Sequence, residues 1–245
     1  MIQKILLATI LLLIVLGQIL LMITPTVGLF VNMFFVLILF ILALYDKRDL
    51  FAQDLLIISA IIPVISIISI SFEIKDVFLS ECIIVDILIF LSLYYLWDFR
   101  LLEHPLQLKT INNFLITIPL ALLTEIGFLY FNHLSQFNSH LPIYISIIFL
   151  ISLPIAETLY FFALVQNLAS DMGGKTAGVI YATALFTLFQ TNGSFHSLIF
   201  YGMLGLMLAC TYNYSRNTYL IIFIIFSIQL TFYLSSGTLL PLTLH

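Results

Sequence analysis

Long apolar segments occur along the whole chain and limit what it can fold into more than any other feature. Several contain no charged residue, and none shows the alternation typical of a β-strand. They are also too long for the strands of a membrane barrel, whereas about 20 apolar residues let a helix cross a bilayer. Nine runs can be distinguished, covering roughly 5–24, 28–45, 55–72, 78–97, 111–131, 142–168, 176–192, 197–214 and 217–234.

The composition excludes most other classes of protein. Only 8% of the 245 residues are charged and 62% are hydrophobic, whereas a soluble domain has about 25% charged residues. Eight basic residues against twelve acidic ones leave no basic patch for nucleic acid. We therefore predict an all-α, polytopic transmembrane helical bundle of about eight or nine spans. It forms a single membrane domain, residues 1–245, with membrane lipid around it.

The positive charges predict the orientation of the bundle. With nine crossings, Lys75 alone falls on one side of the membrane. Cytoplasmic loops carry an excess of Lys and Arg, so the other side is assigned to the cytoplasm. This places the N-terminus inside and the C-terminus outside. The basic residues on the cytoplasmic side are Lys4, Lys47, Arg48, Arg100, Lys109, Lys175 and Arg216.

Three acidic residues stand out within the apolar runs: Asp86, Glu125 and Glu157. An ionisable group at the centre of a membrane helix costs about 2.5–3.5 kcal/mol, so such residues mark candidate sites. Glu157 follows Pro154, and a proline kink can open a polar pocket beside the carboxylate. There it can act as a general base on a water; the alternative is a protonated or paired glutamate that joins two helices. Glu125 is the second candidate, and Asp86 can instead reach toward the interface.

The remaining potential ligands show no metal-site spacing. Cys82 and Cys210 lie far apart in or beside apolar runs, which favours small buried hydrophobes. No histidine is paired at helical spacing with another ligand, as a zinc helix requires. We therefore expect no metal and no cofactor. The histidines lie in predicted loops or the tail: His104, His133, His140, His196 and His245.

Two short motifs lie on the sixth and seventh runs. The first is Glu157–Phe162, read Glu-Thr-Leu-Tyr-Phe-Phe, and the second is Phe186–Gln190, read Phe-Thr-Leu-Phe-Gln. Their order and spacing resemble the CPBP family, which includes type II CAAX prenyl endopeptidases, bacteriocin-processing and immunity proteins and the Abi membrane peptidases. That family has Glu-Glu-x-x-x-Arg and Phe-x-x-x-His at these places. In this chain Thr158 replaces the second Glu, Phe162 the Arg and Gln190 the His.

Later segments extend the resemblance. Tyr201–Gly205 matches a glycine-rich span, and Ser215–Thr218 matches the short basic turn that follows it. The family ends with His-x-x-x-Asn or Asp, and alignment from the turn puts Ser227 and Thr231 at those positions. Glu125 lies where archaeal-type members often carry a glutamate in a span. The resemblance implies N-terminal helices in residues 1–141, followed by a CPBP-like core in residues 142–234.

The depth of the motif positions predicts a common site. At 1.5 Å per residue they all lie about 15–21 Å from the cytoplasmic ends of their runs. In active members, as the resemblance implies, the glutamate activates a water while the histidines and the final Asn stabilise the oxyanion. Losing one such donor typically costs about 10²–10³ in rate, so the substitutions predict weak or absent activity. The positions are Glu157, Gln190, Ser227 and Thr231.

Three functions remain open from the sequence. The first is a CAAX-protease-like intramembrane endopeptidase, a hydrolase centred on Glu157 that is weakly active or inactive. The second is a non-catalytic pseudoenzyme or immunity-type protein that binds a membrane peptide or a membrane protein. The third is a small transporter subunit that uses Glu157, Glu125 and Asp86 as a polar path, although no internal repeat supports it. In each case we expect an integral protein of a prokaryotic cell membrane.

Overall fold

The described part of the chain is helical, as the sequence predicts. The computed structural model describes residues 2–45, 50–71, 88, 143–190 and 195–236, and no strand occurs within these ranges. Apart from Leu88, the predicted runs 78–97 and 111–131 lie outside the described residues, and so do Asp86 and Glu125. The fold class is therefore confirmed as all-α for the part that is described, while the number of spans stays a prediction.

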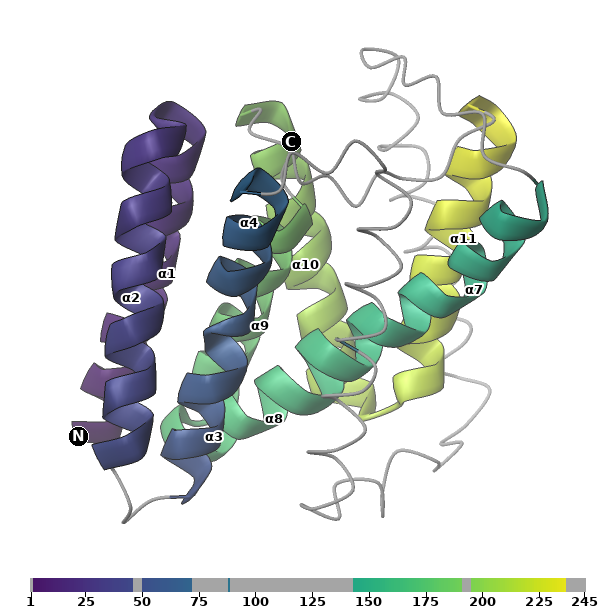
Figure 1. Ribbon diagram of the computed structural model, residues 1–245. Coiled ribbons are helices and arrows are strands. Elements are labelled where there is room, and N and C mark those ends of the chain that lie inside the picture. The colour runs from purple at the N-terminus through teal and green to yellow at the C-terminus, as the bar shows by residue number, and fades with distance from the viewer. Residues whose placement is uncertain (1, 46–49, 72–87, 89–142, 191–194, 237–245) are drawn as a thin grey trace.

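The first two helices form a tight hairpin at one side of the bundle (Figure 1). They are α1 (Ile2–Ile23) and α2 (Pro25–Tyr45). Pro25 begins α2, a position where the missing N–H of proline breaks no helical hydrogen bond. Asn32 is fully buried and donates through Nδ2 to the Gly17 carbonyl at 3.2 Å. Gly17 is needed at this crossing because a Cβ there would collide with the Asn32 side chain.

The third predicted run, 55–72, is broken in the structure. It forms α3 (Leu50–Ser59) and α4 (Ile61–Ser71), separated by a turn at Ala60. Two buried tyrosines bond to the residues before this break. Tyr160 donates to the Ile58 carbonyl at 2.7 Å, and the hydroxyls of Ser59 and Tyr181 are 2.7 Å apart. The break is thus tied to helices from the C-terminal half of the chain.

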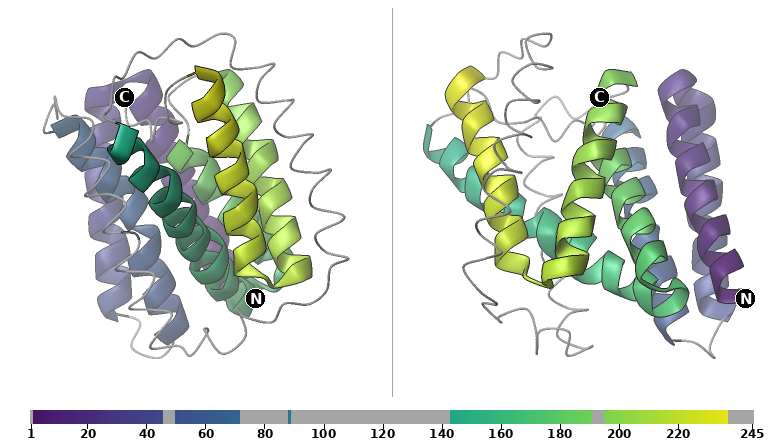
Figure 2. Two further views of the ribbon diagram at one scale, coloured as in Figure 1. Left: turned by 90° about the vertical axis from the view of Figure 1, so that its right-hand side faces the viewer. Right: turned by 180° about the vertical axis from the view of Figure 1, so that it is seen from behind.

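The sixth predicted run, 142–168, is a composite of three helical segments. They are α7 (Ile143–Glu157), the π-helix η2 (Thr158–Val165) and α8 (Gln166–Gly173). Pro154 lies inside α7 one turn before the π-helix starts. The backbone N–H of Gln166 donates to the Phe161 carbonyl, five residues back, as in a π-helix. Figures 1 and 2 show this composite helix crossing the bundle obliquely.

Three further helices complete the described core. They are α9 (Lys175–Gln190), α10 (Phe195–Ser215) and α11 (Thr218–Ser236). Helix α9 packs against α8 and α10, whereas α11 packs against α7 and η2. The α8–α9 and α10–α11 connections lie at the same end of the bundle as the N-terminus (Figure 1). The oblique helix is therefore enclosed by the helices that follow it.

Some helices expose large apolar side chains that soluble proteins bury. Two segments in the described residues are long and apolar enough to cross a membrane, Pro25–Leu42 and Leu150–Gly173. The first exposes most of its side chains, whereas the second is largely buried. A continuous apolar surface of this kind marks contact with lipid or another apolar partner. The exposed side chains of α2 include Val27, Phe30, Met33, Phe34, Leu37, Phe40 and Ile41.

Helices α8 and α9 approach closely at Gly178. A Cβ there would lie 2.6 Å from the Gln166 carbonyl oxygen and would also clash with Ser170 Oγ. We expect Gly178→Ala to lower the free energy of unfolding by about 1–3 kcal/mol, the usual cost of overpacking. The measurement is denaturant-induced unfolding of the full chain in detergent.

Gly202→Ala is the matched control for this prediction. Its new Cβ would meet the Thr187 side chain at 3.9 Å, an ordinary contact. Alanine is also favoured over glycine in helices by about 1 kcal/mol, so this variant should be neutral or slightly stabilised. Equal losses of stability in the two variants would contradict the proposed close approach.

Candidate functional site

Glu157 lies in the interior, at the junction between α7 and the π-helix η2. Its side chain is 1% exposed. Pro154 one turn earlier supplies no backbone N–H, and the wider π-helical turn begins directly after the glutamate. π-Helical segments are rare and often occur at functional sites. The local sequence therefore places a carboxyl group at an irregular point of a buried helix.

Gln190 supplies the hydrogen bond that Glu157 needs. It is the last residue of α9, is itself buried, and donates from Nε2 to Glu157 Oε1. The two residues come from separate helices, α7 and α9. Isolated burial of a carboxyl group is costly, so a partner amide stabilises Glu157 in this position. The structure thus brings together two of the four motif positions predicted from the sequence.

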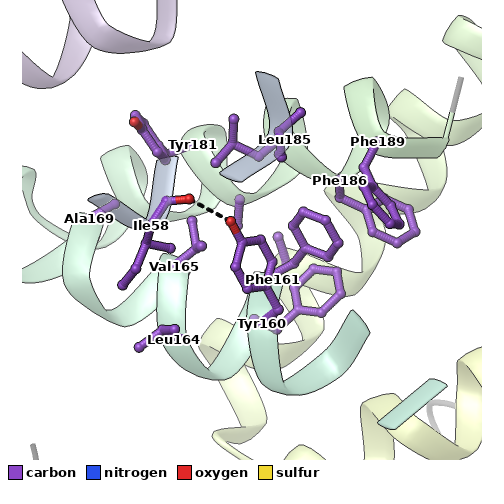
Figure 3. Packing of buried hydrophobic residues seen from close by; sticks show 14 of the residues in the cluster. Ile58, Tyr160, Phe161, Leu164, Val165, Ala169, Tyr181, Leu185, Phe186 and Phe189 are labelled. Carbon is purple, nitrogen blue, oxygen red and sulfur yellow. Dashed lines mark hydrogen bonds between the residues drawn. The ribbon is translucent and has the colours of Figure 1, made fainter. Parts of the chain in front are cut away.

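Aromatic rings pack beside this pair. Phe161, one turn after Glu157, contacts Phe186 with ring centroids 5.6 Å apart and Phe189 at 5.3 Å. Phe162 also contacts Phe186, at 5.7 Å. Figure 3 shows Phe161 of η2 and Phe186 and Phe189 of α9 in this cluster. The packing joins η2 to α9 and makes the surroundings apolar, which strengthens the hydrogen bonds formed there.

Phe162 occupies the place where the family motif has an arginine. It is fully buried against Phe186, so the position serves packing in this chain. No guanidinium group from this position is available to the glutamate. The substitution therefore changes the chemistry of the site while the helix contact is retained.

Two of the buried polar atoms that have no hydrogen-bond partner within the described part of the chain lie on η2 and on α11, which packs against α7 and η2. They are Thr158 Oγ1 on η2 and Gln229 Oε1 on α11. Thr158 Oγ1 differs in this from the hydroxyls of Thr9, Thr24 and Thr187, which donate to the carbonyl four residues back, and resembles those of Thr183 and Thr218. An unpaired buried polar atom costs about 1–3 kcal/mol, so it marks a place where a ligand or water fits.

Two residues were missed by reasoning from the sequence. Tyr201 on α10 is buried and lies close enough to interact electrostatically with Glu157. Gln229 on α11 is 2% exposed. Both are uncharged, and the sequence search followed ionisable groups and aligned motif positions. The amide of Gln229 within an apolar run is the sequence signal that could have identified this residue.

The other predicted site residues have different outcomes. Ser227 and Thr231 are half-buried on α11, whose neighbours are α7 and η2. Asp86 and Glu125 lie outside the described residues, so the structure does not place them. The residues that it does describe contain no group of three or more His, Cys, Asp or Glu side chains able to hold a metal.

The Glu157–Gln190 pair combines one side chain that titrates with one that does not. A carboxyl oxygen accepts hydrogen bonds, and an amide side chain both donates and accepts them. Glu157 has the chemistry of a general base, but one of its oxygens is bonded to Gln190. Gln190 neither titrates nor carries positive charge, so it cannot relay a proton as histidine does.

Comparison with known proteins agrees with the motifs. Residues 139–231 match the family model described as Type II CAAX prenyl endopeptidase Rce1-like. No curated protein and no solved structure matches the chain. The matched segment contains α7, η2, α8, α9, α10 and most of α11, and therefore both members of the buried pair. Over residues 139–231 the chain is therefore similar to this family of CAAX endopeptidases, in agreement with the resemblance of its motifs.

Proposed function

We propose that this protein binds a peptide segment within the membrane at the Glu157–Gln190 site and hydrolyses it slowly or not at all. The observation that carries the proposal is the hydrogen bond from Gln190 Nε2 to the buried Glu157 carboxyl. The glutamate of the family motif is retained, but its neighbour is an amide where the family has a histidine. The site therefore keeps recognition chemistry and a carboxyl group, and it lacks the acid–base chemistry of the histidine.

Hydrolysis at this site would lack several contributions that lower the barrier. General acid–base catalysis by a positioned group typically supplies about 10²–10⁴ in rate. An oxyanion donor typically supplies about 10²–10³. Phe162 and Gln190 stand in place of the ionisable Arg and His of the family motifs. These losses support a weakly active or inactive endopeptidase.

Peptide binding requires much less than catalysis. A peptide bond presents one N–H donor and one carbonyl acceptor, and both need partners in an apolar interior. Glu157 supplies an acceptor. Thr158 Oγ1 and Gln229 Oε1, which have no partner among the described residues, add further polar atoms on helices next to α7. This arrangement supports a peptide ligand over a purely apolar one.

The name of the matched family supplies the first peptide to test. It refers to prenylated CAAX sequences, so a farnesylated CAAX peptide is compared with the same peptide lacking the lipid. A non-catalytic binding protein of immunity type would use the same site. The slow peptidase and the binding protein differ only in whether the bound peptide is cleaved.

We also propose that the chain crosses the membrane nine times with its N-terminus in the cytoplasm. The exposed apolar faces of α1 and α2 support a lipid environment. Lys175 begins α9 and Arg216 follows α10, and both connections lie at one end of the bundle (Figure 1). Basic residues gathered at one end fit the positive-inside rule.

Cysteine labelling tests this orientation. In a background carrying Cys82→Ser and Cys210→Ser, a membrane-impermeant maleimide is applied to intact cells. Thr24→Cys, in the turn between α1 and α2, should be labelled from outside. Ser215→Cys, at the end of α10, should be labelled after permeabilisation alone. The opposite pattern, or equal labelling at both positions, would reject the orientation.

Binding and cleavage of the peptide test the site. The full chain in proteoliposomes should retain the peptide. Its cleavage should not exceed that of Glu157→Gln by more than about tenfold, since the histidine and arginine of the family motifs are missing. Glu157→Ala should weaken binding, because a buried hydrogen bond is lost. The measurements are photo-crosslinking and mass spectrometry of the peptide. Rapid cleavage abolished by Glu157→Gln would show an active peptidase and overturn the proposed inactivity.

Placing at position 190 the histidine of the family motif tests why cleavage at the site is expected to be slow. Gln190→His returns an ionisable partner to Glu157 and should raise cleavage by about tenfold or more, as a positioned acid–base group does. Gln190→Asn, which does not titrate, is the matched control and should leave cleavage unchanged. If both variants behave alike, the missing histidine is not what limits the reaction.

A further inference from the structure

The direction in which Glu157 points depends on the π-helix that follows it. An α-helix turns by about 100° per residue, whereas the hydrogen bonds of a π-helix close one residue later. If η2 changed to an α-helix, α7 would rotate relative to α8 by about one residue, or roughly 100°. Glu157 is the last residue of α7. Such a rotation would therefore turn its carboxyl group away from Gln190.

Side chains from α8 hold the far end of the π-helix. Asn167 donates from Nδ2 to the Ala163 carbonyl, inside η2, at 2.7 Å. The same Nδ2 lies 3.1 Å from the Tyr212 hydroxyl of α10. Gln166 donates to the Ala209 carbonyl of α10 at 2.9 Å. The junction between η2 and α8 is thus fastened to α10 by two neighbouring amide side chains.

Arg216 completes this network from the turn between α10 and α11. Its guanidinium group donates to Asn167 Oδ1 and lies 5.9 Å from the centroid of the Tyr212 ring. The carboxylate of Asp171, on α8, attracts the same guanidinium. Because Arg216 engages Oδ1, the Nδ2 of Asn167 is directed toward Ala163 and Tyr212. The arginine therefore orients the amide that reaches the π-helix.

The backbone of Arg216 adopts a conformation that usually favours glycine. Its φ is 51°, and its N–H donates to the Tyr212 carbonyl, so it ends α10 as a left-handed cap. A residue with a Cβ is strained in this region, whereas glycine is not. Glycine would form this turn with less strain, so the geometry of the turn does not by itself explain why arginine occurs at position 216. Its contact with Asn167 supplies a reason for a long cationic side chain.

We propose that Arg216 is a positioning residue: through Asn167 it maintains the π-helical register that directs Glu157 toward Gln190. The route is continuous in the structure, from the guanidinium to Asn167, to the Ala163 carbonyl and along η2 to the glutamate. Tyr160, bonded to the Ile58 carbonyl, fixes the middle of the same segment. Loss of Arg216 frees the η2–α8 junction and allows the α-helical register.

Carbodiimide modification of Glu157 tests this proposal. Dicyclohexylcarbodiimide is apolar and reacts with protonated carboxyl groups in apolar surroundings. It is applied to the full chain in proteoliposomes, and the modified residue is identified by mass spectrometry. Arg216→Ala should change the rate at which dicyclohexylcarbodiimide modifies Glu157 by about tenfold, because the hydrogen bond from the charged guanidinium to Asn167 is lost. Arg216→Lys keeps a cationic donor and should restore most of the wild-type rate.

Lys175→Ala is the matched control, since it removes an exposed cation at the same end of the bundle. It should leave the rate unchanged. Asn167→Ala should give the same change of rate as Arg216→Ala. The double variant should add no further change, because both residues act through the same series of contacts. Equal rates in Arg216→Ala, Lys175→Ala and the wild type would overturn the proposal, as would failure of lysine to restore the rate.

Two features keep the outcome interpretable. If Arg216→Ala does not fold, Tyr212→Phe removes the hydroxyl facing Asn167 and should give a smaller change of the modification rate in the same direction. An unchanged rate in Tyr212→Phe would count against the network.

The proposal rests on Glu157 as the centre of the proposed site. Since the readout is modification of the carboxyl group, absent peptide binding would overturn the proposed function alone.

Discussion

A carboxyl group removed from water needs a hydrogen-bond partner where it is buried, and the core of this protein is arranged around that requirement. Glu157 lies in an apolar bundle, and Gln190 supplies the partner. For the two to meet, the end of α7 must face the end of α9. The π-helix and the Phe161–Phe186 contact hold those helices in place. The packing and the polar pair therefore depend on each other.

The same pair shows that helix packing and proton transfer place different demands on side chains. A helix contact needs shape and volume, which phenylalanine provides at position 162 as an arginine would at the same point of the helix. Proton transfer needs groups that titrate, which glutamine does not provide. Residues 139–231 match the family model although positions 162 and 190 carry Phe and Gln. A fold can persist after its reaction is lost, since function resides in particular side chains.

Helix positions were largely predictable because apolar runs of about 20 residues have few other solutions. The runs at 5–24, 28–45, 176–192, 197–214 and 217–234 each correspond to a helix within a few residues. The runs at 55–72 and 142–168 also became helical, but the first is broken at Ala60 and the second contains a π-helix. Each irregularity lies close to a proline, Pro63 after the break and Pro154 before the π-helix, and side chains that contact the two turns stabilise their geometry. Tyr160 and Tyr181 stabilise the first, and Asn167 and Arg216 contribute to the second.

The sequence by itself determined the helical class, the scarcity of charge and the candidate pair of Glu157 and Gln190 at similar depth. It did so because periodicity, hydropathy and the 1.5 Å rise per residue are local properties. Tertiary structure decided which side chains touch: that Gln190 bonds to Glu157, that Tyr201 and Gln229 are buried polar groups of the same core, and that Arg216 reaches Asn167. These contacts depend on helix rotation and crossing, which are set by packing between segments far apart in the chain.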